Sequence, residues 1–193
     1  MNNSTKKTIA FVAILVLVVI GLFTLGKSGN PPPNQSATIS QIPIDGSAPD
    51  FNLKSLSGET YSLSQYKDQN PVLLEFFAVW CPHCQIQAKV TKQVADSNFE
   101  AGLVTIGINS SPFGRFYTTG SNASVTENDI KWFLEQFDAH EPLLVDNGSV
   151  GQLYDLQGFP MLVLVNKEGK IAWSQSGEVS ASALQAEIDK VLQ

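Results

Sequence analysis

The chain has 193 residues, of which 43% are hydrophobic, and its formal net charge is −6. This length is enough for one well-packed domain. The acidic balance argues against nucleic acid as a partner and shows no basic surface for anionic lipid.

An apolar segment near the N-terminus predicts a membrane anchor. Residues 8–25 form an uncharged run that would span about 27 Å as a helix. Lys6 and Lys7 precede this run, so we expect residues 1–7 to be cytoplasmic, residues 8–26 to cross the membrane, and the remainder to be extracytoplasmic, in the periplasm or on the outer face of the plasma membrane. A cleaved signal peptide is the alternative, although its apolar core would be shorter, about 7–15 residues.

A polar linker separates this segment from the predicted globular domain. Residues 27–45 are rich in Asn, Pro, Gln and Ser, and residues 46–193 are enough for one domain. We expect the domain to open with a β-hairpin over residues 50–62. The apolar, aromatic run over residues 72–79 then predicts a buried strand, although it contains Glu75.

Trp80-Cys81-Pro82-His83-Cys84 contains both cysteines of the chain. A helix is predicted over residues 82–97, which places Cys81 at its N-terminus and Pro82 at its first position. The unpaired N–H groups and the positive end of the helix dipole favour a thiolate there, and His83 adds a donor and, when protonated, a positive charge beside the sulfur. We therefore expect Cys81 to be the exposed nucleophile and Cys84 to be the more buried resolving thiol.

A structural disulfide and a zinc site are the alternatives for this pair. A bridge across two intervening residues removes little entropy from the unfolded chain. Zinc would need three or four ligands, and only His83 and His140 remain to join the two thiols. The pattern favours redox chemistry without a metal or a cofactor, and we expect His140, in a polar turn, to be solvated.

The remaining elements complete an alternating α/β pattern. Residues 103–108 predict a strand that pairs in parallel with residues 72–79 through the intervening helix. We then expect a long surface loop (109–125), a helix opened by a capping box at Thr126, a short strand (143–145), a short helix (150–154), a hairpin of residues 161–165 and 171–175, and a last helix from Ser180. Pro160, just before the hairpin, either caps an edge or forms a cis turn.

Three segments resemble a known family. Residues 74–84 resemble the active-site segment of the thioredoxin superfamily, and their Cys-Pro-His-Cys core is the version seen in DsbA-type oxidants. Residues 46–63 and 158–170 are similar to the opening hairpin and the cis-proline strand of the TlpA/ResA branch of membrane-tethered thiol–disulfide oxidoreductases and related redoxins. The resemblance covers about residues 46–193.

The resemblance implies an α/β fold, a thioredoxin-like sandwich whose central mixed sheet is flanked by helices. It also implies an N-terminal β-hairpin and a central insertion of a strand and a helix, with the one transmembrane helix preceding the domain. The implied activity is disulfide exchange between the Cys81–Cys84 pair and extracytoplasmic protein thiols. A second membrane or extracytoplasmic protein would reset the pair.

The resemblance also assigns roles to residues around the pair. Pro160 is expected to be cis and to face Cys81, so that Phe159 offers its backbone to a substrate strand. Trp80 is expected to pack beside the thiol and shield it. Glu75 matches the buried acid of thioredoxin-like oxidoreductases, where desolvation would favour its protonated form and let it exchange a proton with Cys84.

Three other functions stay open at this point. Reductants of the ResA/TlpA type, such as those of cytochrome c maturation, commonly carry Cys-Glu-Pro-Cys or Cys-Gly-Pro-Cys, so the direction of electron flow is unsettled. A thiol peroxidase is disfavoured because Ala78 stands where peroxiredoxins place Thr or Ser. A Sco-like copper chaperone would use a longer Cys-x-x-x-Cys spacing.

Overall fold

The computed structural model describes residues 43–139 and 142–193 of the chain. The predicted cytoplasmic end, membrane anchor and most of the linker, together with His140, lie outside the described residues. None of the helices in the described part combines the length and the apolar character that crossing a membrane requires.

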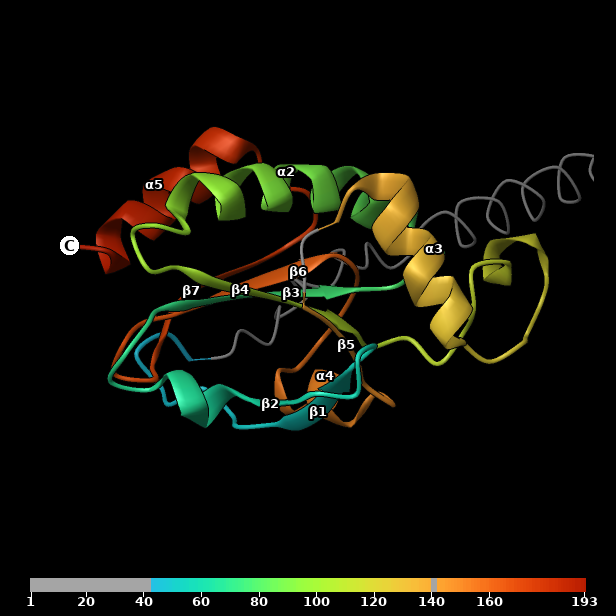
Figure 1. Ribbon diagram of the computed structural model, residues 1–193, viewed down its shortest axis with the longest axis horizontal. Coiled ribbons are helices and arrows are strands. Elements are labelled where there is room, and N and C mark those ends of the chain that lie inside the picture. Colours follow the sequence, from blue (N-terminus) through green and yellow to red (C-terminus); the bar gives the residue numbers. More distant parts are fainter. Residues whose placement is uncertain (1–42, 140–141) are drawn as a thin grey trace, which may run out of the picture. The chain divides into compact units, whose positions relative to one another are not determined.

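A seven-stranded mixed sheet forms the centre of the domain (Figure 1). Its strands lie in the order β2-β1-β5-β4-β3-β6-β7. The strands are β1 (Asn52–Ser55), β2 (Thr60–Ser62), β3 (Val72–Phe77), β4 (Val104–Asn109), β5 (Leu143–Val145), β6 (Met161–Val165) and β7 (Ile171–Ser176). The helices are α2 (Pro82–Asn98), α3 (Glu127–Phe137), α4 (Ser149–Leu153) and α5 (Ala181–Val191), with short 3-10 turns at Leu63–Tyr66 (η1) and Tyr117–Thr119 (η2).

The pairing of the strands confirms the predicted α/β pattern. Strand β3 pairs in parallel with β4, and α2 makes the connection between them. The predicted hairpins are present, because β1 pairs antiparallel with β2 and β6 pairs antiparallel with β7. The predicted strand and helix of the insertion correspond to β5 and α4, and β5 joins the sheet between β1 and β4.

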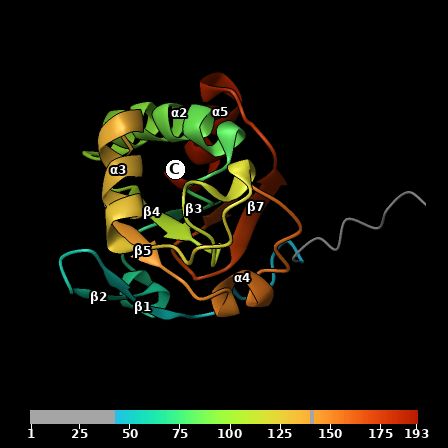
Figure 2. The ribbon, with the colours of Figure 1, turned by 90° about the vertical axis from the view of Figure 1, so that its right-hand side faces the viewer.

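Each face of β3 contributes to a different part of the core, because side chains alternate along a strand. Leu73 and Phe77 face α2 and the other helices of that side, α5 and α3, while Leu74 and Phe76 face the opposite layer. That opposite layer includes Leu63 of η1, Val150 of α4 and Tyr154, which directly follows α4. Figures 1 and 2 show α2, α5 and α3 together on one side of the sheet and α4 on the other.

Two predicted segments differ from the structure. Strand β3 ends at Phe77 rather than residue 79, because the N–H of Val79 bonds to the side chain of Asn109 instead of a neighbouring strand. The segment 109–125 was expected to be a surface loop, but it begins with the buried Ser110 and Ser111 and contains η2.

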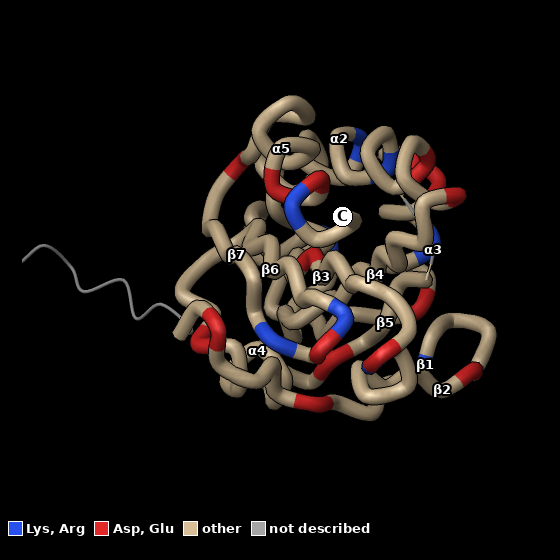
Figure 3. Tube along the Cα trace, turned by 90° about the vertical axis from the view of Figure 1, so that its left-hand side faces the viewer, with Lys and Arg blue, Asp and Glu red and all other residues tan. Residues whose placement is uncertain are grey.

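Charged residues of both signs are distributed around the described domain. Figure 3 shows the Lys and Arg positions interspersed with Asp and Glu, and no basic stripe runs along an element of the described part.

Candidate active site

The turn between β3 and α2 carries the cysteine pair just beyond the end of β3. Helix α2 begins at Pro82 and Cys81 is its N-cap residue, as the sequence predicts. The N–H of Cys81 donates to the oxygen of Ala78 at 3.0 Å, which closes the turn. Proline at the first helical position leaves no unused N–H there, while the N–H groups of the following residues point toward the Cys81 sulfur.

Asn109, at the end of the neighbouring strand β4, fixes this turn from the side. Its side-chain oxygen accepts from the N–H of Val79 at 3.3 Å, and its side-chain nitrogen donates to the oxygen of Ser111 at 2.9 Å. Asn109 is completely buried, so these bonds satisfy polar groups that water cannot reach.

The two thiols are free and differ in their surroundings. A hydrogen bond from the Cys84 side chain, supported by the N–H groups of Cys84 and His83 and by the charge of His83, lowers the pKa of Cys81 to about 6 against the opposing effect of burial. Burial raises the pKa of Cys84, and so does the hydrogen bond that it shares with Cys81. At neutral pH the pair therefore holds one thiolate, on Cys81, and one thiol, on Cys84.

The exposure expected for Cys81 is wrong. Only 5% of Cys81 is exposed, and Cys84 is completely buried. The reason is a second loop: the Cys81 sulfur lies 3.7 Å from the main-chain oxygen of Phe159, and the Phe159–Pro160 peptide bond is cis, as expected. The Cys81 sulfur is thus covered by the loop before β6 and by the side chains around it.

Aromatic side chains surround the covered sulfur. Trp80 is half-buried, packs against the cluster that contains Cys81, and donates from Nε1 to the hydroxyl of Ser111 at 2.7 Å. Its ring lies 6.1 Å from that of Phe159, edge to face, and 5.0 Å from that of Tyr117 in η2. Trp80 therefore links the active-site turn to the loop after β4.

The side chain of His83 lies at the surface, next to an acidic residue. Its Nδ1 is 2.5 Å from a carboxylate oxygen of Glu178, which lies between β7 and α5. The bond to Glu178 raises the pKa of His83. The sequence predicted His83 as a donor beside the Cys81 sulfur, whereas the structure shows its imidazole engaged by Glu178 while its backbone N–H and its charge act on Cys81.

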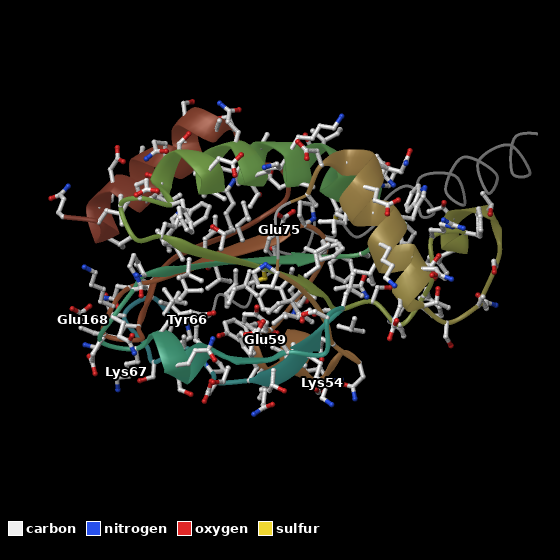
Figure 4. The ribbon with its side chains drawn as sticks, in the orientation of Figure 1. Lys54, Glu59, Tyr66, Lys67, Glu75 and Glu168 are labelled. Atoms are coloured by element: carbon white, nitrogen blue, oxygen red, sulfur yellow. The ribbon has the colours of Figure 1, made fainter. Side chains whose placement is uncertain are left out.

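Glu75 lies inside the domain, on the face of β3 that is covered by α2. It is 2% exposed, and Figure 4 shows it between the sheet and the helices above it. Its charge contributes to the raised pKa of Cys84. The structure therefore brings Glu75 into the neighbourhood of the second thiol.

Sequence reasoning did not single out Asn109, Ser111 or Glu178. Asn109 could have been noticed as the polar residue that ends an apolar strand. Glu178 carries no local signal, because 95 positions separate it from His83. Within residues 43–139 and 142–193, no group of three or more His, Cys, Asp or Glu side chains is placed to hold a metal ion.

Comparison with known proteins agrees with this geometry. Residues 44–174 match the AhpC/TSA family. The chain belongs to this family. It is 24% identical over 189 residues to the thiol-disulfide oxidoreductase ResA of Bacillus cereus, which covers 96% of the chain and 98% of that relative. It is 28% identical over 185 residues to the thiol:disulfide interchange protein DsbE of Yersinia pestis, covering 93% and 88% of the two chains.

The fold is also found among solved structures. The crystal structure of a protein described as a putative thiol:disulfide interchange protein DsbE from Chlorobium tepidum superposes with a TM-score of 0.67. It covers 79% of this chain and 100% of its own, with 24% sequence identity. At this identity the likeness shows the thioredoxin-like fold.

Proposed function

We propose that this protein is a thiol–disulfide oxidoreductase of the ResA/DsbE type, in which Cys81 and Cys84 alternate between a dithiol and a disulfide. The observation that carries the proposal is the unequal placement of the pair: Cys81 caps the N-terminus of α2 beside the cis-proline loop, and Cys84 is completely buried. This placement lowers the pKa of Cys81 to about 6 and raises that of Cys84. Only the thiolate attacks disulfides, so the pair is prepared for an ordered exchange.

Exchange would proceed in two steps. In the first step the Cys81 thiolate attacks one sulfur of a substrate disulfide, forming a mixed disulfide while the other substrate sulfur leaves as a thiolate and takes up a proton. In the second step Cys84 loses its proton and attacks the Cys81 sulfur, which releases the second substrate thiol. Two electrons pass from the pair to the substrate, and oxidation of a substrate dithiol is the reverse of these steps.

The surrounding residues support this sequence of steps. Glu75, near Cys84 and covered by α2, is proposed to receive the proton that Cys84 must lose. The backbone of Phe159, beside cis-Pro160, is proposed to pair with an extended substrate strand next to Cys81. Trp80 is proposed to form one side of this contact.

A low pKa of Cys81 favours the oxidising direction. Stabilising the thiolate stabilises the dithiol form, which makes the disulfide a stronger oxidant. We propose a reduction potential above that of thioredoxin, about −270 mV, and toward that of DsbA, about −120 mV. A potential near or below thioredoxin's would instead assign the protein to the dedicated reductases.

The cellular setting of this activity is also a proposal. The apolar run at residues 8–25 supports a single N-terminal anchor with the domain on the extracytoplasmic side, where disulfide exchange has protein substrates. A second membrane or extracytoplasmic protein would return the pair to its starting state. The completely buried Ala78 offers no hydroxyl for a peroxide, which argues against a thiol peroxidase.

A trapping experiment tests the exchange mechanism. The full chain in detergent, carrying Cys84→Ser, should accumulate mixed disulfides with a model disulfide-bonded protein, because the second step is blocked. The Cys81→Ser variant should accumulate none, although it retains one thiol. Equal trapping by the two variants, or trapping by Cys81→Ser alone, would contradict the assignment of the nucleophile.

A further inference from the structure

We propose that Glu178 is a positioning residue of the redox site, which holds the charged imidazole of His83 at the first turn of α2 and thereby makes the Cys81–Cys84 disulfide easier to reduce at neutral pH. The proposal rests on the proposed function, since it concerns the equilibrium of the same pair. It adds a residue from the β7–α5 connection to a site otherwise built by β3, α2 and the loop before β6.

The contact between the two side chains is the first observation. The 2.5 Å separation of His83 Nδ1 and Glu178 Oε1 is that of a strong, charge-assisted hydrogen bond. The side chains are 69% and 40% exposed. A surface pair of this kind contributes little to stability by itself, so its effect must be sought in the neighbouring thiolate.

The backbone on both sides of Glu178 is fixed, which is the second observation. The N–H of Gly177 donates to the oxygen of Pro160 at 2.8 Å. The N–H of Val179 donates to the side-chain oxygen of Gln87 in α2, also at 2.8 Å, and Gln87 is almost completely buried. Glu178 is therefore held between the cis-proline loop and α2, the two segments that contact Cys81.

The charges around His83 decide the sign of the effect. In the described part of the chain, the charged groups that act on His83 are Glu178 and the Cys81 thiolate, and both raise its pKa. The imidazolium in turn favours the Cys81 thiolate. The Glu178 carboxylate favours the protonated form of His83 in the disulfide state as well as in the dithiol state, so the positive charge is already beside Cys81 when reduction forms the thiolate.

Without Glu178, reduction of the disulfide would be accompanied by the uptake of a proton at His83. In Glu178→Gln, His83 would be largely neutral beside the disulfide above its ordinary pKa of 6.5, and would take up a proton when the Cys81 thiolate forms. That proton uptake cancels the proton released by the thiols. The pH dependence of the equilibrium, rather than only its value, therefore reports on Glu178.

The experiment measures the equilibrium of the pair with glutathione in the full chain between pH 5.5 and 7.5. For the unaltered protein, the constant for reduction should rise about tenfold per pH unit above pH 6.5, since one proton is released. For Glu178→Gln it should rise less than about threefold per unit. The constants for reduction of the two proteins should be equal at pH 5.5. At pH 7.5 the constant of Glu178→Gln should be about three- to tenfold lower, so that the variant is harder to reduce.

Two further variants separate positioning from simple charge. Glu178→Asp retains the charge but shortens the side chain, so it should resemble Glu178→Gln. In a His83→Ala background, Glu178→Gln should change nothing, because Glu178 acts through His83. Glu168→Gln, in the turn between β6 and β7, removes an equal charge at the opposite end of the domain and should follow the unaltered protein (Figure 4).

The outcomes are separable from those of the proposed function. If the unaltered pair does not exchange with glutathione at all, the proposed function is wrong. If it exchanges and Glu178→Gln shows the same constant and the same pH dependence, only the role of Glu178 is wrong. An easier reduction in Glu178→Gln, or an effect that persists in the His83→Ala background, would mean that the carboxylate repels the thiolate directly and would also overturn the inference.

Discussion

The sulfur of Cys81 lies 3.7 Å from the main-chain oxygen of Phe159, although 78 positions separate the two residues in the chain. The contact joins the end of β3 to the start of β6, which are neighbours in the sheet. It explains why Cys81, in the turn between β3 and α2, is only 5% exposed. This position beside the sulfur supports the proposal that an extended substrate strand pairs with the Phe159 backbone.

Alkylation of the reduced protein should show one reactive thiol. We expect the rate at Cys81 to have its midpoint near pH 6 and to fall about tenfold per pH unit below it, because only the thiolate reacts. Cys84 should not be labelled in the native protein. Rates measured by mass spectrometry with iodoacetamide test this, and a midpoint at the pH of an ordinary thiol would contradict it.

The two replacements of Cys84 provide a matched comparison for the same measurement. The Cys84 side chain makes the largest contribution to the low pKa of Cys81. Cys84→Ala should therefore shift the alkylation midpoint of Cys81 to higher pH. Cys84→Ser should shift it less, because its hydroxyl can still donate to the thiolate. Equal shifts would mean that the hydrogen bond between the side chains is not the cause.

The stability of the reduced protein should depend on pH through Cys81. Its pKa is lowered from an ordinary value of 9.0 to about 6 in the folded state, so its stabilising effect is present above pH 9 and is lost as pH falls to 6. The free energy of unfolding of the reduced protein should therefore rise between pH 6 and 8. Urea denaturation of Cys81→Ser should show no such rise. If the free energy of unfolding has the same pH dependence in the two proteins, Cys81 is not its cause.

Replacing Glu75 by Gln should slow the second step of exchange more than it destabilises the domain. Loss of a proton acceptor typically reduces a rate by about 10²–10⁴-fold, and we expect the lower end of this range. Mixed disulfides at Cys81 should then persist, which stopped-flow measurements with a fluorescent substrate would detect. An unchanged pH–rate profile, with only a lower urea midpoint, would make Glu75 a structural residue.

Asn109→Ala should destabilise the domain and loosen the active-site turn. The substitution leaves the N–H of Val79 and the oxygen of Ser111 without their partner inside the protein. Each unsatisfied buried group costs about 1–3 kcal/mol, so the two together should lower the free energy of unfolding by about 2–6 kcal/mol in urea denaturation. Asn52→Ala, at an exposed position of β1, is the control and should cost little. An equal loss of stability in Asn109→Ala and Asn52→Ala would show that Asn109 does not hold the turn.

The sequence by itself determined the chemistry and most of the elements. Two cysteines separated by Pro82 and His83, after an apolar run and before a helical pattern, are local features. Local features set the strand, the N-terminus of α2 and the position of Cys81 at that terminus. The capping box at Thr126 and the N-cap at Ser180 are local in the same sense, and both are present.

Only the tertiary structure decided what surrounds the thiol. The cover over Cys81, the bonds of Asn109 to the active-site turn and the pairing of His83 with Glu178 each join segments that are 30 or more positions apart. No local pattern encodes such contacts, because they arise when the sheet brings the ends of β3, β4, β6 and β7 together. The sequence therefore placed Cys81 where a thiolate is favoured, and the packed fold decided which side chains and backbone groups act on it.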